Sequence, residues 1–124
     1  MDPIADLLIA IKNGYMARRK DVSMPYSKFK LAVAQVLENE KFVGKVEKVD
    51  RAINIELIYT NGKPKIEQVK KVSKLGLRVY SKSKNIKTIK GGRGMTIVTT
   101  SQGVMSGREA KSKKLGGEVI CQLW

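Results

Sequence analysis

The chain has no histidine and only one cysteine, which narrows the chemistry that it can perform. Without histidine there is no imidazole general base, no histidine-bearing zinc site and no Ser–His or Cys–His nucleophile pair. The single cysteine, Cys121, cannot form an internal disulfide, so we expect a reducing, cytoplasmic environment. Its apolar neighbours favour a buried structural thiol over a nucleophile. Because no pair of carboxylates stands out as acid and base, we expect no enzyme, no metal and no cofactor.

Acidic residues and long apolar runs are scarce as well. The 124 residues include 25 Lys plus Arg against 11 Asp plus Glu, which gives a formal net charge of +14 at pH 7. Ordinary surfaces mix both signs, so this excess predicts a polyanionic partner. No apolar run approaches the about 20 residues that span a bilayer, and no basic region precedes an apolar stretch at the N-terminus. We therefore expect neither a membrane partner nor a signal peptide.

The positive charge is concentrated in the second half of the chain. Residues 1–67 contain 12 basic and 9 acidic residues, whereas residues 68–124 contain 13 basic and 2 acidic residues. These basic residues are interleaved with Val, Ile, Leu and Gly, which predicts a folded basic face and not a disordered tail. The hydrophobic fraction of 42% also predicts a folded core.

Hydrophobic spacing in the first half predicts an α+β fold with the order αβαββ. Asp2-Pro3 is typical of a helix start, and Asn13-Gly14 is expected to end that helix. A strand around 22–24 closes at Pro25, and Ser27 caps a second helix whose apolar face includes Phe29. The spacing then predicts two strands, at 46–49 and 53–59.

Asn61-Gly62 predicts a tight hairpin turn, and the charge composition changes just after it. We place a boundary there, between an αβαββ sub-domain at 1–62 and a mainly antiparallel β sub-domain at 63–124. In the second sub-domain we expect strands, a helical turn, a connector and a short helix opened by a Ser106/Glu109 capping box. The strands are expected at 66–72, 77–80, 95–99 and 118–123, the helical turn at 85–89 and the connector at 91–94.

Hydroxyl and amide side chains are grouped between an expected strand and an expected helix, at Thr99-Thr100-Ser101-Gln102-Gly103. Such a loop can bind phosphate oxygens, ribose hydroxyls and base edges, or it can be a turn that caps its own backbone. Both interpretations stay open from the residues alone. Tyr80, flanked by Arg78 and Lys82, likewise either stacks on a base or packs on a sheet.

Several short motifs occur in one order along nearly the whole chain. They are residues 2–6 with 11–14, Met24-Pro25-Tyr26-Ser27-Lys28, Gly76-Leu77-Arg78-Val79-Tyr80, Thr99 to Met105, and Leu115-Gly116-Gly117-Glu118-Val119. In these motifs the chain resembles the bacterial-type S8 family of small-subunit ribosomal proteins. Gln102 stands where that family often has a basic residue.

This resemblance implies a non-enzymatic primary binder of the central domain of small-subunit ribosomal RNA that helps the domain assemble. It implies RNA contacts by Thr99, Thr100, Ser101, Gly103 and Tyr80, and by Lys28 and Lys30 in a basic N-terminal region. From the matching motifs and the basic face we add further RNA-binding candidates, which are Arg78, Gln102, Arg108, Lys113, Lys114 and Glu118.

The same resemblance implies neighbouring small-subunit ribosomal proteins as partners and, through repression, the protein's own mRNA. We expect a monomer outside the ribosome and a place on a cytoplasmic ribosome, with an organellar ribosome left open. The alternative function is a general nucleic-acid-coating or compacting protein, for which charge would suffice and an ordered hydroxyl loop would not be required.

Overall fold

The structure is a computed structural model that describes residues 3–74, 76–86 and 93–124. It is a mixed α+β fold with antiparallel sheets, as predicted, and it divides into two units, Met1–Glu67 and Gln68–Trp124. The helix start expected at Asp2 and the first two residues of the connector expected at 91–94 lie outside the described residues. The boundary after Gly62 stays a prediction.

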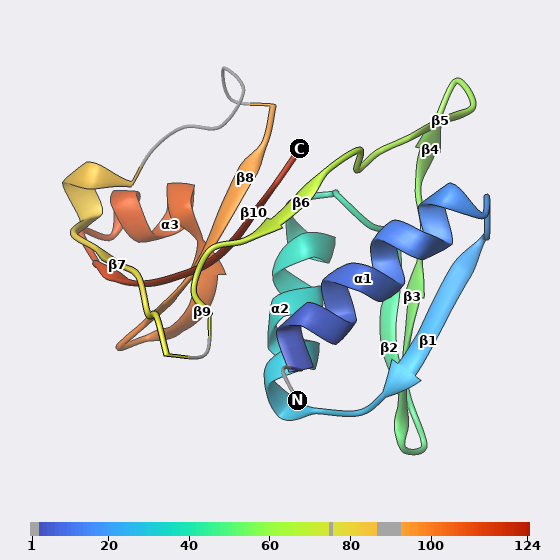
Figure 1. Cartoon of the computed structure of the whole chain (residues 1–124), viewed down its shortest axis with the longest axis horizontal. Helices are drawn as coiled ribbons and strands as arrows, with labels where there is room; N and C mark the ends of the chain where they lie inside the picture. Colours follow the sequence, from blue (N-terminus) through green and yellow to red (C-terminus); the bar gives the residue numbers. More distant parts are fainter. Residues whose placement is uncertain (1–2, 75, 87–92) are drawn as a thin grey trace. The chain divides into compact units, whose positions relative to one another are not determined.

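The first unit has the predicted order αβαββ (Figure 1). Its main elements are α1 (Pro3–Met16), β1 (Asp21–Pro25), α2 (Lys28–Asn39), β2 (Val46–Val49) and β3 (Ala52–Glu56). The strands form an antiparallel sheet in the order β1-β3-β2. Ile53 and Ile55 on the central strand are fully buried, and α1 and α2 contact each other as well as the sheet. Alternation of apolar and polar residues along β1 and β3 therefore places one face of the sheet in the core.

The prediction that Asn13-Gly14 ends the first helix is wrong, because α1 continues to Met16. Gly14 is buried inside the helix, and a Cβ there would lie 2.4 Å from Val22 Cγ1 and 2.9 Å from Leu57 Cδ1. The glycine thus allows the helix to lie close to the sheet. The left-handed residue that follows the helix is Arg18, with φ of 57°.

The second helix begins as predicted, since the Ser27 side chain accepts a hydrogen bond from the Lys30 backbone N–H at 3.4 Å. Phe29, however, is 36% exposed and does not belong to the core. The buried face of α2 instead consists of Lys30, Val33, Ala34, Val36 and Leu37.

The Asn61-Gly62 hairpin is confirmed. It joins β4 (Tyr59–Thr60) to β5 (Lys63–Pro64), with φ of 53° at Asn61 and 77° at Gly62. Tyr59, which the spacing places on one long strand with Ile53, lies in β4 because β3 ends at Glu56.

The second unit is mainly antiparallel β, as predicted. Its elements are β6 (Val69–Lys71), β7 (Tyr80–Ser81), the 3₁₀ helix η1 (Ser83–Asn85), β8 (Met95–Thr100), β9 (Gly103–Ser106), α3 (Gly107–Ser112) and β10 (Gly117–Leu123). The sheet order is β6-β10-β8-β9, and β7 also pairs with β10. A core of Ile86, Val98, Met105, Ala110 and Val119 fills the space between α3 and the sheet.

The first two strands of this unit are shorter than predicted, since β6 ends at Lys71 and β7 begins at Tyr80. The Ser73 Oγ accepts a hydrogen bond from the Val79 N–H at 2.9 Å, and the backbones of Lys74 and Leu77 pair with each other. A buried serine hydroxyl thus takes the place of strand pairing. The helical turn lies at Ser83–Asn85, earlier than expected, and residues 87–89 of that prediction lie outside the described residues.

Half of the predicted capping box is present at α3. The Ser106 Oγ accepts from the Glu109 N–H at 3.1 Å, but the Glu109 carboxylate lies 3.3 Å from Lys113 Nζ. Cys121 is fully buried in β10, as predicted, and burial raises the pKa of its thiol to about 12. Within the described ranges, no helix is both long and apolar enough to cross a membrane.

Candidate nucleic-acid interface

The hydroxyl-rich segment forms the turn between β8 and β9. Thr100 pairs with Gly103, so that Ser101 and Gln102 make a two-residue turn. The Thr100 Oγ1 accepts a hydrogen bond from the Gln102 N–H at 3.1 Å and donates one to the Gly103 carbonyl at 3.0 Å. This hydroxyl therefore closes its own turn, which is one of the two interpretations of the sequence.

The tip of the same turn remains available to a partner. Ser101, Gln102 and Gly103 are exposed, and no hydrogen bond between described residues engages the side chain of Ser101 or Gln102. Because Thr100 fixes the turn, these side chains and the backbone beside them are held in place before any ligand arrives. Preorganised polar groups lose less conformational entropy on binding than mobile ones do.

Tyr80, Glu118 and Thr99 form one row across the sheet beside this turn. Tyr80 pairs with Glu118 across β7 and β10, and Glu118 pairs with Thr99 across β10 and β8. Directly paired residues of antiparallel strands project from the same face, so the three side chains share one face. The neighbouring pair, Val119 and Val98, belongs to the core on the opposite face. The row therefore faces away from the α3 core.

The ring of Tyr80 is 71% exposed, which excludes a role in filling the core. The tyrosine is placed by β7, and Val79, whose N–H donates a hydrogen bond to the Ser73 Oγ, directly precedes this strand. An exposed ring beside polar groups offers a flat surface on which a base can stack. Sequence analysis did not identify Ser73, because its role depends on a hydrogen bond with the Val79 N–H that local sequence patterns do not predict.

Glu118 acts on the neighbouring arginine. Its Oε2 lies 3.3 Å from Arg78 Nη1, and its side chain is 17% exposed against 50% for that of Arg78. The carboxylate holds the guanidinium next to the row, although a partly exposed ion pair contributes only about 0 to 1 kcal/mol to stability. The contact of Glu118 that the structure shows is the one with Arg78, and its RNA contact stays a prediction.

Two glycines allow β10 to begin between β7 and β8. A Cβ on Gly117 would lie 2.1 Å from the Thr99 carbonyl oxygen, and one on Gly116 would lie 2.7 Å from that of Ser81. In both cases the obstacle is backbone, which cannot rotate away. These glycines are thus required for the row and for the β8–β9 turn to be neighbours.

An open depression of about 550 Å³ adjoins Tyr80. It is lined by Tyr80, Ser81, Lys82, Ser83, Lys114 and Gly116. Lys82 and Lys114 are both exposed, and they come from segments on either side of the depression, before η1 and before β10. Among these residues only Tyr80 and Lys114 are predicted site residues. Lys82 and Ser83 join them because Gly116 brings the two segments together.

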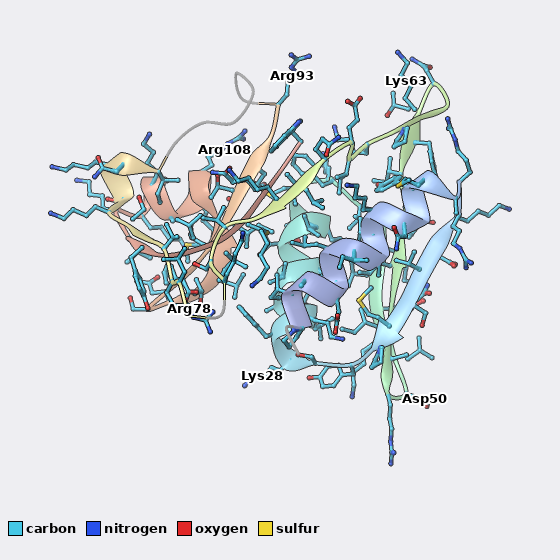
Figure 2. All side chains as sticks on the ribbon, in the orientation of Figure 1. Lys28, Asp50, Lys63, Arg78, Arg93 and Arg108 are labelled. Carbon is cyan, nitrogen blue, oxygen red and sulfur yellow. The ribbon has the colours of Figure 1, made fainter. Side chains whose placement is uncertain are left out.

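The remaining basic candidates of this unit are more dispersed. Lys113 is exposed and forms an i,i+4 ion pair with Glu109. Arg108 is exposed at the start of α3. This helix follows the end of β9 that is farther from the β8–β9 turn. Figure 2 shows Arg108 close to α3 and Arg78 at the lower edge of this unit. The structure therefore brings Arg78, but not Arg108, to the row.

Lys28 and Lys30 belong to the other unit. Lys28 is exposed in the first turn of α2 and points away from the helix (Figure 2). Lys30 is only 6% exposed, so it is poorly placed to contact a phosphate. No group of His, Cys, Asp or Glu side chains that could hold a metal ion occurs in the part of the chain that the structure describes.

Comparison with known proteins relates the whole chain to one family. The model of the family described as Ribosomal protein S8 matches residues 2–124. A relative from Oleidesulfovibrio alaskensis, named small ribosomal subunit protein uS8, is 44% identical over 123 residues, which cover 99% of this chain and 98% of the relative. Relatives with the same name from Burkholderia lata and Pseudomonas syringae pv. tomato are 47% and 44% identical and cover 97% and 99% of this chain, and 95% and 97% of their own lengths.

Proposed function

The chain belongs to the ribosomal protein S8 family, and from this premise we propose that its second unit binds a helix in the central domain of small-subunit ribosomal RNA. Proteins of this family are structural constituents of the small ribosomal subunit and not enzymes. What we propose in addition is the RNA site, the way it reads its target and the consequence of binding, which is assembly of the central domain.

The observation that carries this proposal is the row of Tyr80, Glu118 and Thr99 beside the β8–β9 turn. An exposed aromatic ring, an anchored arginine and a preformed polar turn lie next to one another on the face that the core does not use. Non-specific attraction of RNA by positive charge would not require this arrangement of side chains. A site that recognises one particular RNA structure does require a fixed arrangement, because each side chain must contact a particular base, ribose or phosphate.

The physical form of RNA indicates how such a site works. The major groove of an A-form helix is too deep and narrow for side chains, so specific proteins bind irregular sites with unstacked bases and accessible 2′-hydroxyls. In our proposal Tyr80 stacks on such a base, while Ser101, Gln102 and the turn backbone bond to base edges and ribose. Arg78 and Lys114 bind flanking phosphates, and Thr99 lines the row.

Basic residues outside the row supply attraction that does not depend on the RNA sequence. We assign Lys113, Arg108 and Lys28 to this group because they are exposed and lie away from the row or on the other unit. Each phosphate contact releases counterions and therefore makes binding weaker at higher salt. In our proposal these residues attract RNA of any sequence, and the row and the β8–β9 turn select the cognate RNA.

The proposal extends to regulation and to partners. An mRNA that imitates the ribosomal site would occupy the same row and turn, so we propose repression of the protein's own message through this surface. We also propose contacts with neighbouring small-subunit proteins, a monomer outside the ribosome, and action in the cytoplasm.

A filter-binding titration tests the proposal. The intact protein is titrated with a central-domain RNA fragment and with a scrambled duplex of equal length, each at two salt concentrations. We expect a large preference for the central-domain fragment that survives at the higher salt. Equal binding that falls steeply with salt for both RNAs would contradict it and would favour the general nucleic-acid-coating function instead.

A further inference from the structure

The sequence contains two Asn-Gly pairs, Asn13-Gly14 and Asn61-Gly62, and the fold places them in different surroundings. The first pair lies inside α1, and the second forms the turn of the β4–β5 hairpin (Figure 1). Both asparagine side chains belong to exposed residues. Any difference in their chemistry therefore depends on the glycine that follows each of them.

An asparagine that precedes glycine can lose its side-chain amide without an enzyme. The backbone nitrogen of the glycine gives up its proton to hydroxide and attacks Cγ of the asparagine. A C–N bond forms, and the amide group takes a proton from water and leaves as ammonia. Water then opens the resulting succinimide ring at either carbonyl, which leaves aspartate or isoaspartate. Glycine favours the ring closure because it has no side chain to obstruct it.

The reaction thus has two structural requirements, a glycine nitrogen without a hydrogen bond and space for the ring. Gly14 meets neither of them. It lies within α1, where each backbone N–H donates to a carbonyl one helical turn earlier. It is also buried, and an added Cβ would lie 2.4 Å from Val22 Cγ1, so the space beside it is filled. The helix therefore protects Asn13.

Gly62 meets both requirements. The hairpin pairs Thr60 with Lys63, and no hydrogen bond between described residues engages the Gly62 N–H. An added Cβ on Gly62 would have no atom within 4 Å, so the ring has open space. The Gly62 carbonyl accepts a hydrogen bond from Arg18 Nη1, which leaves the nitrogen of the same residue unengaged.

We propose that Asn61 is a site of spontaneous deamidation in the folded protein, whereas Asn13 is protected by α1. The reaction needs only water as a co-reactant. It becomes faster as the pH rises, because the glycine nitrogen reacts after losing its proton. It does not involve RNA, so the proposal stands or fails independently of the proposed function.

The isoaspartate product would change the backbone of the hairpin as well as its charge. Isoaspartate carries the main chain through the former side chain, which lengthens the backbone of the turn. Asn61 and Gly62 form a two-residue turn with both φ values positive, and such a turn requires ordinary backbone spacing. We expect β4 and β5 to separate and Arg18 to lose its acceptor. Aspartate with an ordinary backbone would keep the turn, because Asp-Gly is also favoured there.

Peptide mapping of the full chain tests the site. The folded protein is incubated at pH 8, digested with trypsin, and compared with a sample digested before incubation and with protein incubated in urea. Trypsin does not cleave before Pro64, so Asn61 falls in the peptide 52–65 and Asn13 in the peptide 13–18. Isoaspartate is detected by an isoaspartyl methyltransferase with labelled S-adenosylmethionine.

In the folded protein we expect the peptide 52–65 to be labelled more than about tenfold faster than the peptide 13–18, because reaction at Asn13 requires the end of α1 to open. In urea the two peptides should be labelled at similar rates. Asn61→Gln should remove the labelling of 52–65, whereas the control Asn13→Gln should leave it unchanged. Equal labelling of the two peptides in the folded protein, or labelling of 52–65 only in urea, would overturn the proposal.

Urea unfolding tests the consequence for the hairpin. We expect the unfolding midpoint of the parent protein to fall during incubation, and that of Asn61→Gln to stay at its own starting value. Asn61→Asp has the added charge on an ordinary backbone, so it should unfold like the parent before incubation. An unchanged midpoint in the incubated parent, or an equally low one in Asn61→Asp, would overturn the role assigned to the lengthened backbone.

Discussion

The two units use tyrosine in opposite ways. In the first unit Tyr15 is 3% exposed, its hydroxyl donates to the Phe42 carbonyl at 3.2 Å, and the same oxygen accepts from the Ile58 N–H at 3.2 Å. Burial raises the pKa of this phenol above its ordinary value, with a smaller opposing effect from the Ile58 hydrogen bond. In the second unit Tyr80 is 71% exposed and lies on the face away from the core. The same residue type is buried within the fold in one unit and is exposed to solvent in the other.

The two units also differ in how far acidic residues balance the basic ones. The first unit balances 12 basic residues with 9 acidic ones, whereas the second sets 13 against 2. Of the two carboxylates in the second unit, Glu118 pairs with Arg78 and Glu109 with Lys113. Acidic side chains thus balance most basic side chains in the first unit, whereas most basic side chains of the second unit have no acidic counterpart, in keeping with our proposal that the second unit carries the selective RNA site.

The largest effect is expected from the glycines that each unit uses for close packing. Gly117→Ala should cost about 3 kcal/mol of stability, because the new Cβ meets the backbone of Thr99. Gly14→Ala should cost less, since its obstacles are the methyl groups of Val22 and Leu57 and alanine favours a helix by about 1 kcal/mol. Urea unfolding measures both. Equal losses would show that β10 tolerates a shift beside Thr99.

The two tyrosines give the next prediction. Tyr80→Ala should weaken binding of the central-domain fragment by about 1 to 3 kcal/mol with little change in stability, because a stacking ring is lost from an exposed position. Tyr15→Phe should lower stability by about 1 to 2 kcal/mol and leave RNA binding unchanged, because it removes the partner of the buried Phe42 carbonyl and of the partly buried Ile58 N–H. Tyr80→Phe should bind like the parent protein. Filter binding measures the RNA affinity of the three variants, and urea unfolding measures their stability. A loss of stability in Tyr80→Ala together with a loss of RNA affinity in Tyr15→Phe would contradict the comparison.

A smaller change is expected from the lysines near the start of β10. Lys113→Ala with Lys114→Ala should weaken binding of cognate and scrambled RNA alike and reduce the salt slope by about 2 at most. Lys113 contributes less because it is paired with Glu109. Filter binding over a range of salt concentrations provides the measurement. A loss confined to the cognate RNA would instead place these lysines in the selective part of the site.

The smallest effect concerns the buried thiol. The folded protein should not react with a thiol reagent at pH 8, whereas the unfolded protein and folded Ser101→Cys should react. The thiol's ordinary pKa is 9.0 and burial raises the pKa to about 12, so the unfolded state releases its proton first. Its contribution to the free energy of unfolding is therefore complete below pH 9 and falls as the pH rises towards 12. Comparison with Cys121→Ala isolates this contribution, and rapid labelling of the folded protein would contradict it.

Local signals explain the part of the fold that could be predicted from the sequence. The caps at Ser27 and Ser106 and the Asn61-Gly62 turn depend on residues within a few positions of each other, and all three are confirmed. The role of Gly14 could not be predicted, because it depends on Val22 and Leu57 on other elements. The burial of Lys30 likewise follows from tertiary packing and not from its position in α2.

The candidate site shows the same limit. The Thr99–Gly103 segment and Tyr80 are recognisable as motifs, but their common row depends on strand register. That register includes an irregularity in β10 between Val119 and Cys121, which no local pattern announces. The depression beside Tyr80 likewise depends on Gly116 lying against the backbone of Ser81. Sequence motifs thus identified the candidate side chains, whereas the strand register of the sheet shows which of these side chains are neighbours.

The central claim is that the β8–β9 turn and its row select the RNA while the surrounding cations only attract it. The most direct test is filter binding of Thr100→Ala with Ser101→Ala, beside a control of Thr100→Ser alone, to the central-domain fragment and to the scrambled duplex. The account predicts a loss of about 1 to 3 kcal/mol for the cognate fragment, little loss for the scrambled duplex, and near-normal binding by Thr100→Ser. Equal losses on both RNAs, or no loss on either, would contradict it.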